Sequence, residues 1–282
     1  MLERAAGLSP EALDAIADLE RRVIDADGGR LKLEWGTLRR RSGEQVEDLL
    51  WWEGDRLAGF LGLYPYGETV ELAGMVAPDS RRRGIATALL DGAAPLFRER
   101  GTSQVLLIVP RSSVAGQRFA AHRGAVLDHS EHALTLSGAP PDGPRDPALS
   151  LRPASTCDLA SIRRLLEVGF GRPAPADDLA AQLDSPHRRT LVVELEGSVV
   201  GTLMVTRDGA EAGVYGFVVD PPFQGRGIGR EALRRTCEQL RADGARQVRL
   251  EVEVENDRAL ALYTGMGFEP VTTEDYFSLS PS

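Results

Sequence analysis

The residues best suited to chemistry in this chain lie in two glycine-rich segments. The first reads RRRGIA from Arg81 to Ala86, and the second reads QGRGIG from Gln224 to Gly229. Each segment follows a strand-like run and opens a helix-like one, the context in which main-chain N–H groups bind phosphate. Glycine lets the main chain approach a pyrophosphate without a clash from Cβ. Both segments therefore predict a phosphate-binding loop.

These segments also admit simpler interpretations. A lone glycine-rich stretch is often only a tight turn between two elements. A dinucleotide-binding G-x-G-x-x-G motif requires a glycine at its sixth position, where the second segment is followed by Arg230. A P-loop requires Gly-Lys-Ser/Thr, which the sequence does not contain. A dinucleotide-dependent oxidoreductase is therefore not favoured.

A second motif follows the second loop. The segment from Asn256 to Phe268 has the spacing N-x-x-A-x-x-L-Y-x-x-x-G-F and begins 32 residues after Gln224. Together, the Q-x-x-G-x-G loop and this segment resemble the GNAT N-acetyltransferase superfamily. The resemblance covers residues 151–282 well and residues 1–137 more loosely.

The resemblance implies an acetyl-CoA site in the second half of the chain, with no metal. Main-chain amides of the loop would hold the pyrophosphate, and the strand before it would pair with the pantetheine arm. Tyr263 matches the family's general acid, a phenol that protonates the departing thiolate; the alternative is a tyrosine that only packs on the core. The implied cofactor-binding residues are Val218, Val219, Gln224, Gly225, Arg226, Gly227, Ile228, Gly229, Arg230 and Asn256.

The implied reaction is direct attack of a neutral primary amine on the thioester, with main-chain N–H groups holding the oxyanion. The general base stays open. Family members often carry a glutamate eleven residues before the Gln, where this chain has Gly213. Nearby carboxylates could accept the proton through water or attract a cationic acceptor, or they could simply form a solvated strand face. These carboxylates are Glu211, Glu251, Glu253 and Glu255.

The first glycine-rich segment lacks the matching second motif. Ser113 stands where the other half has Asn256, and Ala120 stands where it has Tyr263. Glu71, ten residues before Arg81, is either a relic base or an edge-strand carboxylate. We therefore expect a degenerate, non-catalytic copy with a structural or regulatory role, which still keeps residues that suit a cofactor phosphate. These residues are Arg81, Arg82, Arg83, Gly84 and Ala86.

The two halves form an internal repeat. Glycine, proline and loop positions recur at a common offset of 143 residues, as in Gly84 and Gly227 or Pro78 and Pro221. A fixed offset indicates duplication. We predict two tandem GNAT-like domains of mixed α/β class, each a twisted mixed sheet flanked by helices. The predicted domains are residues 1–137 and 149–282, and the Pro- and Gly-rich stretch 138–148 is the linker.

The order of elements is clearest in the second copy. Hydrophobic periodicity and turn residues predict strands and helices in alternation. The first copy repeats this order from a helix over 9–24, with a short or missing opening strand. Strands are expected over 151–155, 190–207 with a central turn, 212–220, 247–254 and 268–280, and helices over 158–170, 229–244 and 257–267.

Composition limits the partners. The chain has 33 basic and 42 acidic residues, a net charge of −9, and neither half forms a basic nucleic-acid platform. No apolar run suits a membrane helix, and the N-terminal residues do not resemble a secretion signal, so we expect a cytoplasmic protein with a small-molecule or peptide amine as acceptor. A non-catalytic acyl-CoA sensor or scaffold is the alternative function. Loops such as 170–185 would shape the acceptor pocket, and the oligomeric state stays open.

Overall fold

The computed structural model describes residues 1–171, 179–180, 183, 185 and 187–280. These residues form two compact units. The first unit comprises Met1–His132 together with Val271–Ser282, and the second comprises Ala133–Pro270. Most of the expected acceptor loop, 170–185, lies outside the described residues. Each unit is considered by itself below.

The first unit combines one sheet with four α-helices among the described residues. Its sheet has the order β1-β2-β3-β4-β5-β12-β6, in which β4 and β5 run parallel, whereas the pairs β1–β2, β2–β3, β3–β4 and β5–β12 are antiparallel. The elements are β1 (Leu2–Ala5), α1 (Pro10–Asp27), α2 (Trp35–Leu38), β2 (Asp48–Glu53), β3 (Arg56–Tyr66), β4 (Thr69–Val76), α3 (Ile85–Glu99), β5 (Gln104–Pro110), α4 (Val114–His122), the first part of β6 (Val126–Leu136) and nearly all of β12 (Glu269–Leu279).

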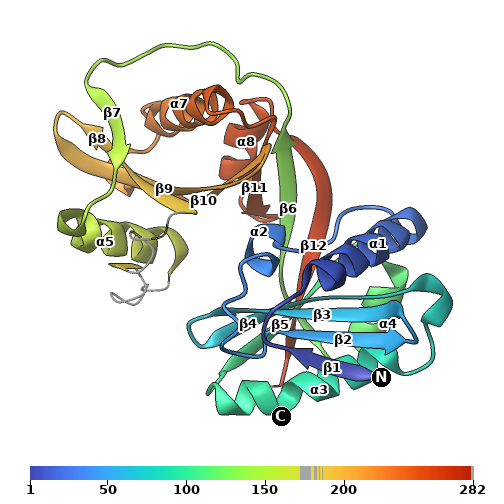
Figure 1. Cartoon of the computed structure of the whole chain (residues 1–282). Helices are drawn as coiled ribbons and strands as arrows, with labels where there is room; N and C mark the ends of the chain where they lie inside the picture. Colours follow the sequence, from blue (N-terminus) through green and yellow to red (C-terminus); the bar gives the residue numbers. More distant parts are fainter. Residues whose placement is uncertain (172–178, 181–182, 184, 186, 281–282) are drawn as a thin grey trace. The chain divides into compact units, whose positions relative to one another are not determined.

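Two helices cover opposite faces of this sheet (Figure 1). Helix α1 begins at a proline, and its N-cap Ser9 accepts a hydrogen bond from the N–H of Ala12. Its buried residues Ile16, Leu19 and Val23 recur at helical spacing and pack on one face of the sheet. Helix α3 packs on the other face, so both sides of β4 are buried.

The C-terminal strand belongs to the first unit. Strand β12 pairs antiparallel with β5, from Glu274 opposite Pro110 to Leu279 opposite Val105. The unit boundary therefore differs from the expected domain 149–282. The sequence repeat gave the order of the elements, but strand pairing decides which sheet a terminal strand completes.

The second unit repeats this architecture. Its sheet has the order β6-β11-β10-β9-β8-β7, with β10 and β11 parallel. Helices α5 and α7 lie on opposite faces of β9 and β10 (Figure 1). The elements are the last part of β6, β7 (Leu149–Pro153), α5 (Leu159–Phe170), β8 (Arg188–Leu195), β9 (Ser198–Asp208), β10 (Glu211–Val219), α7 (Ile228–Ala242), β11 (Gln247–Glu253) and α8 (Asp257–Thr264).

The predicted mixed α/β class is confirmed in both units. The expected strands and helices of the second copy are present within a few residues of their predicted ends, and the first copy has a four-residue opening strand, β1. Within the described ranges, none of the helices has the length and apolar character needed to cross a membrane.

Candidate active site

The loop of the second unit connects β10 to α7. Gly225 and Gly227 have φ angles of 79° and 84°, in the left-handed region that favours glycine. A Cβ on Gly227 would meet no atom within 4 Å, so the main chain faces open space there. No side chain caps the start of α7. The first N–H groups of the helix are therefore available to an anion.

The loop of the first unit has nearly the same backbone. Gly84 has φ 82° at the start of α3, which also lacks a side-chain cap. Arg82 has φ 64° at the position that corresponds to Gly225. Left-handed backbone is unfavourable for a residue with a Cβ, so the fold holds Arg82 in a strained conformation. Both loops therefore keep the shape that a phosphate site needs.

The first side chain of each loop braces it against the preceding strand. The side-chain amide of Gln224 donates to the carbonyl of Val219 at 2.7 Å, and Nε of Arg81 donates to the carbonyl of Val76 at 3.2 Å. The guanidinium of Arg81 also forms two hydrogen bonds with Asp27. The side chain of Arg81 is thus committed to Val76 and Asp27, and the direct role in phosphate binding that the sequence suggests for it stays a prediction.

The other two arginines of this loop differ in their surroundings. Arg83 forms an ion pair with Glu53 at 2.8 Å, which leaves its guanidinium partly committed. Arg82 makes no ion pair within the described part of the chain. Of the three arginines, Arg82 is thus the one best placed to meet an anionic ligand.

A wedge opens in each sheet beside the loop. In the second unit, pairing of β10 with β11 ends at Gly213 opposite Arg249, while β10 continues along β9 to Val219. In the first unit, pairing of β4 with β5 ends at Ala73 opposite Ile108. The remaining segment of each strand has one main-chain edge without a strand partner, to which an extended amide-containing ligand can add.

The wedge of the first unit contains a cavity of about 710 Å³. This volume lies in the range of small-molecule sites. Both walls of the wedge, the loop and helix α4 line it, together with Asp27 and Ser113. Its lining includes Gly74, Met75, Val76, Arg81, Arg82, Gly84, Ala86, Ile108, Val109, Gly116 and His122.

The second motif contributes a helix cap and a buried phenol. Asn256 caps α8 by accepting a hydrogen bond from the N–H of Ala259 at 3.0 Å. Ser113 does the same for α4 through the N–H of Gly116. This capping explains why a small polar residue stands at both positions.

Tyr263 lies in the core of the second unit at 8% exposure, with its ring edge-on to Phe268. Burial raises the pKa of its phenol to about 12. The phenol therefore keeps its proton at neutral pH, as a general acid must. The corresponding Ala120 of the first unit is fully buried and has no proton to donate.

The strand register shows which residue of the second unit corresponds to Glu71, a correspondence that the constant offset of 143 residues does not give. Glu71 pairs with Leu106, and Gly213 pairs with Arg249. Leu106 and Arg249 keep the offset of 143, but Glu71 and Gly213 are only 142 apart, because β10 carries a bulge between Tyr215 and Val218. Glu71 is therefore the structural counterpart of Gly213. The sequence signal for this bulge is a glycine inside the expected strand, Gly216, whose φ is positive in the structure.

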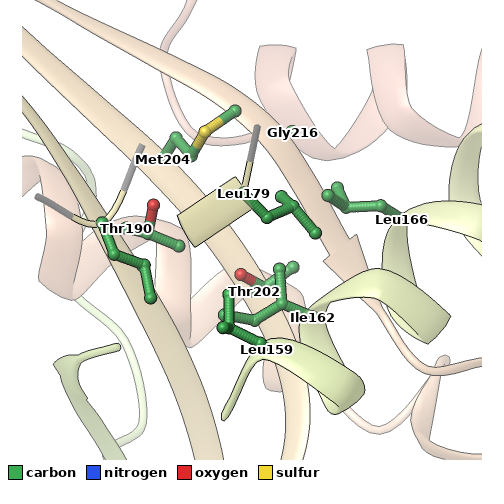
Figure 2. A pocket seen from close by; sticks show the side chains of 9 residues that line it. Leu159, Ile162, Leu166, Leu179, Thr190, Thr202, Met204 and Gly216 are labelled. Carbon is green, nitrogen blue, oxygen red and sulfur yellow. The ribbon is translucent and has the colours of Figure 1, made fainter. Parts of the chain in front are cut away.

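A small hollow under α5 is a packing defect (Figure 2). Its volume of about 10 Å³ is at the lower limit for a single water. Apolar side chains of α5 line one side of it, and the hydroxyl of Thr202 already donates a hydrogen bond to the carbonyl of Leu191. The described residues also bring together no group of three or more His, Cys, Asp or Glu side chains that could hold a metal ion.

Each unit thus has the fold of a CoA-dependent acyltransferase: a mixed sheet, a wedge between two parallel strands and an uncapped helix at its mouth. The acetyltransferase (GNAT) family model matches residues 13–125 and 159–268, so the chain belongs to the GNAT family. It is an acetyl-CoA-dependent N-acetyltransferase built from two GNAT-like domains, as the sequence predicted.

Individual relatives agree with this assignment. The chain is 38% identical over 128 residues to the N-alpha-acetyltransferase RimI of Mycobacterium tuberculosis, a match that covers 44% of this chain and 77% of that protein. A GCN5-related N-acetyltransferase from Sphaerobacter thermophilus aligns with a TM-score of 0.82 and 20% identity, over 100% of this chain and 95% of the other. A tandem GNAT protein from the clavulanic acid biosynthesis pathway aligns with a TM-score of 0.69 and 21% identity, over 100% of this chain and 99% of the other.

Proposed function

We propose that the second unit transfers the acetyl group of acetyl-CoA to a primary amine by direct attack. The observation that carries this proposal is the buried phenol of Tyr263, in the unit that also has the open loop and the wedge. The first unit has the loop and the cavity but Ala120 in place of the phenol. The chemistry is therefore assigned to the second unit.

The donor is proposed to lie along the free edge of β10. Val218 and Val219 would pair with the pantetheine amides, and the main-chain N–H groups from Gln224 to Arg230 would bind the pyrophosphate. Asn256 would contact the cofactor only from the start of α8, since its side-chain oxygen is committed to the cap. Holding the thioester and the amine in one cleft is the main catalytic contribution.

The proton of the attacking amine needs an acceptor. Glu251 is half-buried and lies on β11 two residues beyond the last pair with β10, on the face turned away from α7. Its neighbours in sequence, Leu250 and Val252, point into the α7 core. We propose that Glu251 takes this proton through water while Tyr263 protonates the thiolate.

The similarity to the N-alpha-acetyltransferase RimI suggests a class of acceptor. We propose an α-amino group of a peptide or protein N-terminus. The test is acetyl-CoA turnover with a panel of short peptides that have free α-amino groups, beside matched N-acetylated peptides as blanks. Turnover of free but not blocked peptides is expected, and Tyr263→Phe should lower kcat at least tenfold. No turnover with any free amine would contradict the proposal.

Calorimetric titration of acetyl-CoA assigns the sites. Gly227→Glu should abolish donor binding in the second unit, because a carboxylate would enter the phosphate site. Gly209→Glu is the matched control, since Gly209 also has positive φ and open space around its Cβ position but lies in another turn. If Gly227→Glu retained both acetyl transfer and the wild-type stoichiometry of acetyl-CoA binding, the assignment of the catalytic site to the second unit would be overturned.

The 710 Å³ cavity favours a second role for the first unit. We propose that it binds acetyl-CoA without turning it over. Gly84→Glu should then remove one binding equivalent while leaving the kcat of the second unit unchanged, with Gly67→Glu as the turn control. Loss of all turnover in Gly84→Glu would instead make the first unit the catalytic one.

A further inference from the structure

The second unit has a glycine where the first unit has a carboxylate. Gly213 does not have a positive φ angle, so its backbone does not require glycine. A Cβ at this position would lie 2.4 Å from Cε2 and 2.6 Å from the hydroxyl oxygen of Tyr215. The ring of Tyr215 therefore lies directly against the main chain of Gly213. Glycine is needed there to admit the phenol.

A bulge in β10 follows directly after Tyr215. Tyr215 is opposite Met204, and the regular register with β9 resumes only at Val218, opposite Thr202. Gly216 supplies the left-handed backbone at the bulge, with φ 56°. Bulges re-aim neighbouring side chains and are frequent beside active sites. In the first unit, the pairing of β4 with β3 has no such shift.

Tyr215 shares its face with the polar side of β11. Gly213 is in register with Arg249, and residues two apart on a strand point to the same side. Tyr215 is half-buried on this side, as are Arg249 and Glu251. Arg249 is paired with Glu211 at 2.6 Å, and Glu251, the proposed proton acceptor, points to the same side of the sheet as Tyr215.

We propose that Tyr215 binds the amine acceptor of the second unit, in the place that a carboxylate occupies in the first. This inference rests on the proposed function of that unit. The phenol oxygen accepts a hydrogen bond from an N–H of the amine and so directs the nitrogen lone pair toward the thioester. Tyr215 exchanges no proton in this role; it fixes the position of the nucleophile.

The kinetic test uses the peptide with a free α-amino group that the wild-type protein acetylates fastest. Tyr215→Phe should raise the KM for this peptide about tenfold, as expected for a lost hydrogen bond to a polar substrate. It should leave the Kd for acetyl-CoA unchanged. Gly213→Ala should have the same effect, because the new methyl group displaces the ring. Tyr66→Phe, at an exposed tyrosine of the first unit, is the matched control.

A purely structural role would have other consequences. It would lower the melting temperature of Tyr215→Phe and leave the KM for the peptide unchanged, and that result would overturn the inference. The double variant Gly213→Glu with Tyr215→Ala restores a carboxylate in this place. It should recover part of the lost kcat/KM and show a new dependence on a group that titrates in acid.

A binding measurement separates this inference from the proposed function. The protein is labelled with 3-fluorotyrosine, and the resonance of residue 215 is assigned by its loss in Tyr215→Phe. Titration with alaninamide in the presence of CoA should shift this resonance and leave that of Tyr66 unchanged. If no peptide is acetylated but the shift occurs, the proposed function fails and the amine site stands. If peptides are acetylated without any shift, the Tyr215 assignment fails.

Discussion

The guanidinium of Arg81 and the carboxylate of Asp27 form a bidentate ion pair, with N–O distances of 2.8 and 3.0 Å. The same carboxylate accepts the hydroxyl of Ser113 at 2.8 Å. The pair joins three elements that line the cavity of the first unit: the end of α1, the loop before α3 and the start of α4. Asp27 therefore connects the elements that form the walls of this cavity.

Asp27→Asn should destabilise the first unit by about 1–3 kcal/mol, because a charge-assisted hydrogen-bond pair is lost in a partly buried place. It should also weaken acetyl-CoA binding in the cavity. Urea unfolding and calorimetric titration measure both effects. Asp79→Asn is the control, since Asp79 is also paired with arginines but is 56% exposed. Equal effects of the two substitutions would show that Asp27 has no special role.

The same pair predicts a dependence on pH. Burial raises the pKa of the Asp27 carboxyl, but hydrogen bonds from Arg81 and Ser113 outweigh it, so the pKa lies below its usual value. A carboxyl with a lowered folded pKa stabilises the fold above its unfolded pKa, near 3.9, and this contribution is lost as the pH falls through the folded value. Wild-type stability should therefore fall more steeply below pH 4 than that of Asp27→Asn.

Loop glycines should differ in their tolerance of alanine. Gly225→Ala and Gly227→Ala each force a Cβ into left-handed backbone, at a cost of about 1–2 kcal/mol. Gly229→Ala is the matched control. Its Cβ would make only ordinary contacts of 3.6 Å or more, and the first unit has Ala86 at that position. In thermal unfolding, the melting temperature of Gly229→Ala should thus lie close to that of the wild type. A decrease in melting temperature as large as that of Gly227→Ala would contradict the backbone argument.

The sequence predicted the duplication from a constant offset of 143 residues and both loops from their local glycine pattern, whereas the role of Tyr263 follows from the family resemblance and stays a prediction. Two features depend on contacts between segments that are far apart in the sequence, and the sequence did not predict them. The bulge at Gly216 shifts the register by one residue, so Glu71 corresponds to Gly213 and not to its neighbour at the constant offset. The ion pair of Arg81 with Asp27 requires α1 to end beside the loop, and no local sequence pattern predicts this position.

The C-terminal strand should be essential to the first unit. Tyr276 of β12 is fully buried, packs with Leu106 and Ile108, and donates a hydrogen bond to Glu131 at 2.5 Å. Tyr276→Ala should destabilise this unit by about 3–5 kcal/mol, as is typical for loss of a buried aromatic ring. Val271→Ala, at a 53% exposed position of the same strand, should have little effect. Hydrogen exchange of β5 amides measures the difference.

Loss of the Tyr263 proton should change the stability of the protein only at alkaline pH. Burial raises the pKa of its phenol to about 12, above the unfolded value near 10. A raised folded pKa stabilises the fold fully below the unfolded pKa, and the contribution disappears as the pH rises through the folded one. Between pH 10 and 12, the wild type should therefore lose about 1–3 kcal/mol more stability than Tyr263→Phe. The acetylation rate of the wild type should show no decline from loss of the Tyr263 proton below pH 10. Equal stability loss in both proteins, measured by urea unfolding at pH 9 and 11, would mean that the phenol titrates as an exposed tyrosine does and is not buried as a proton donor.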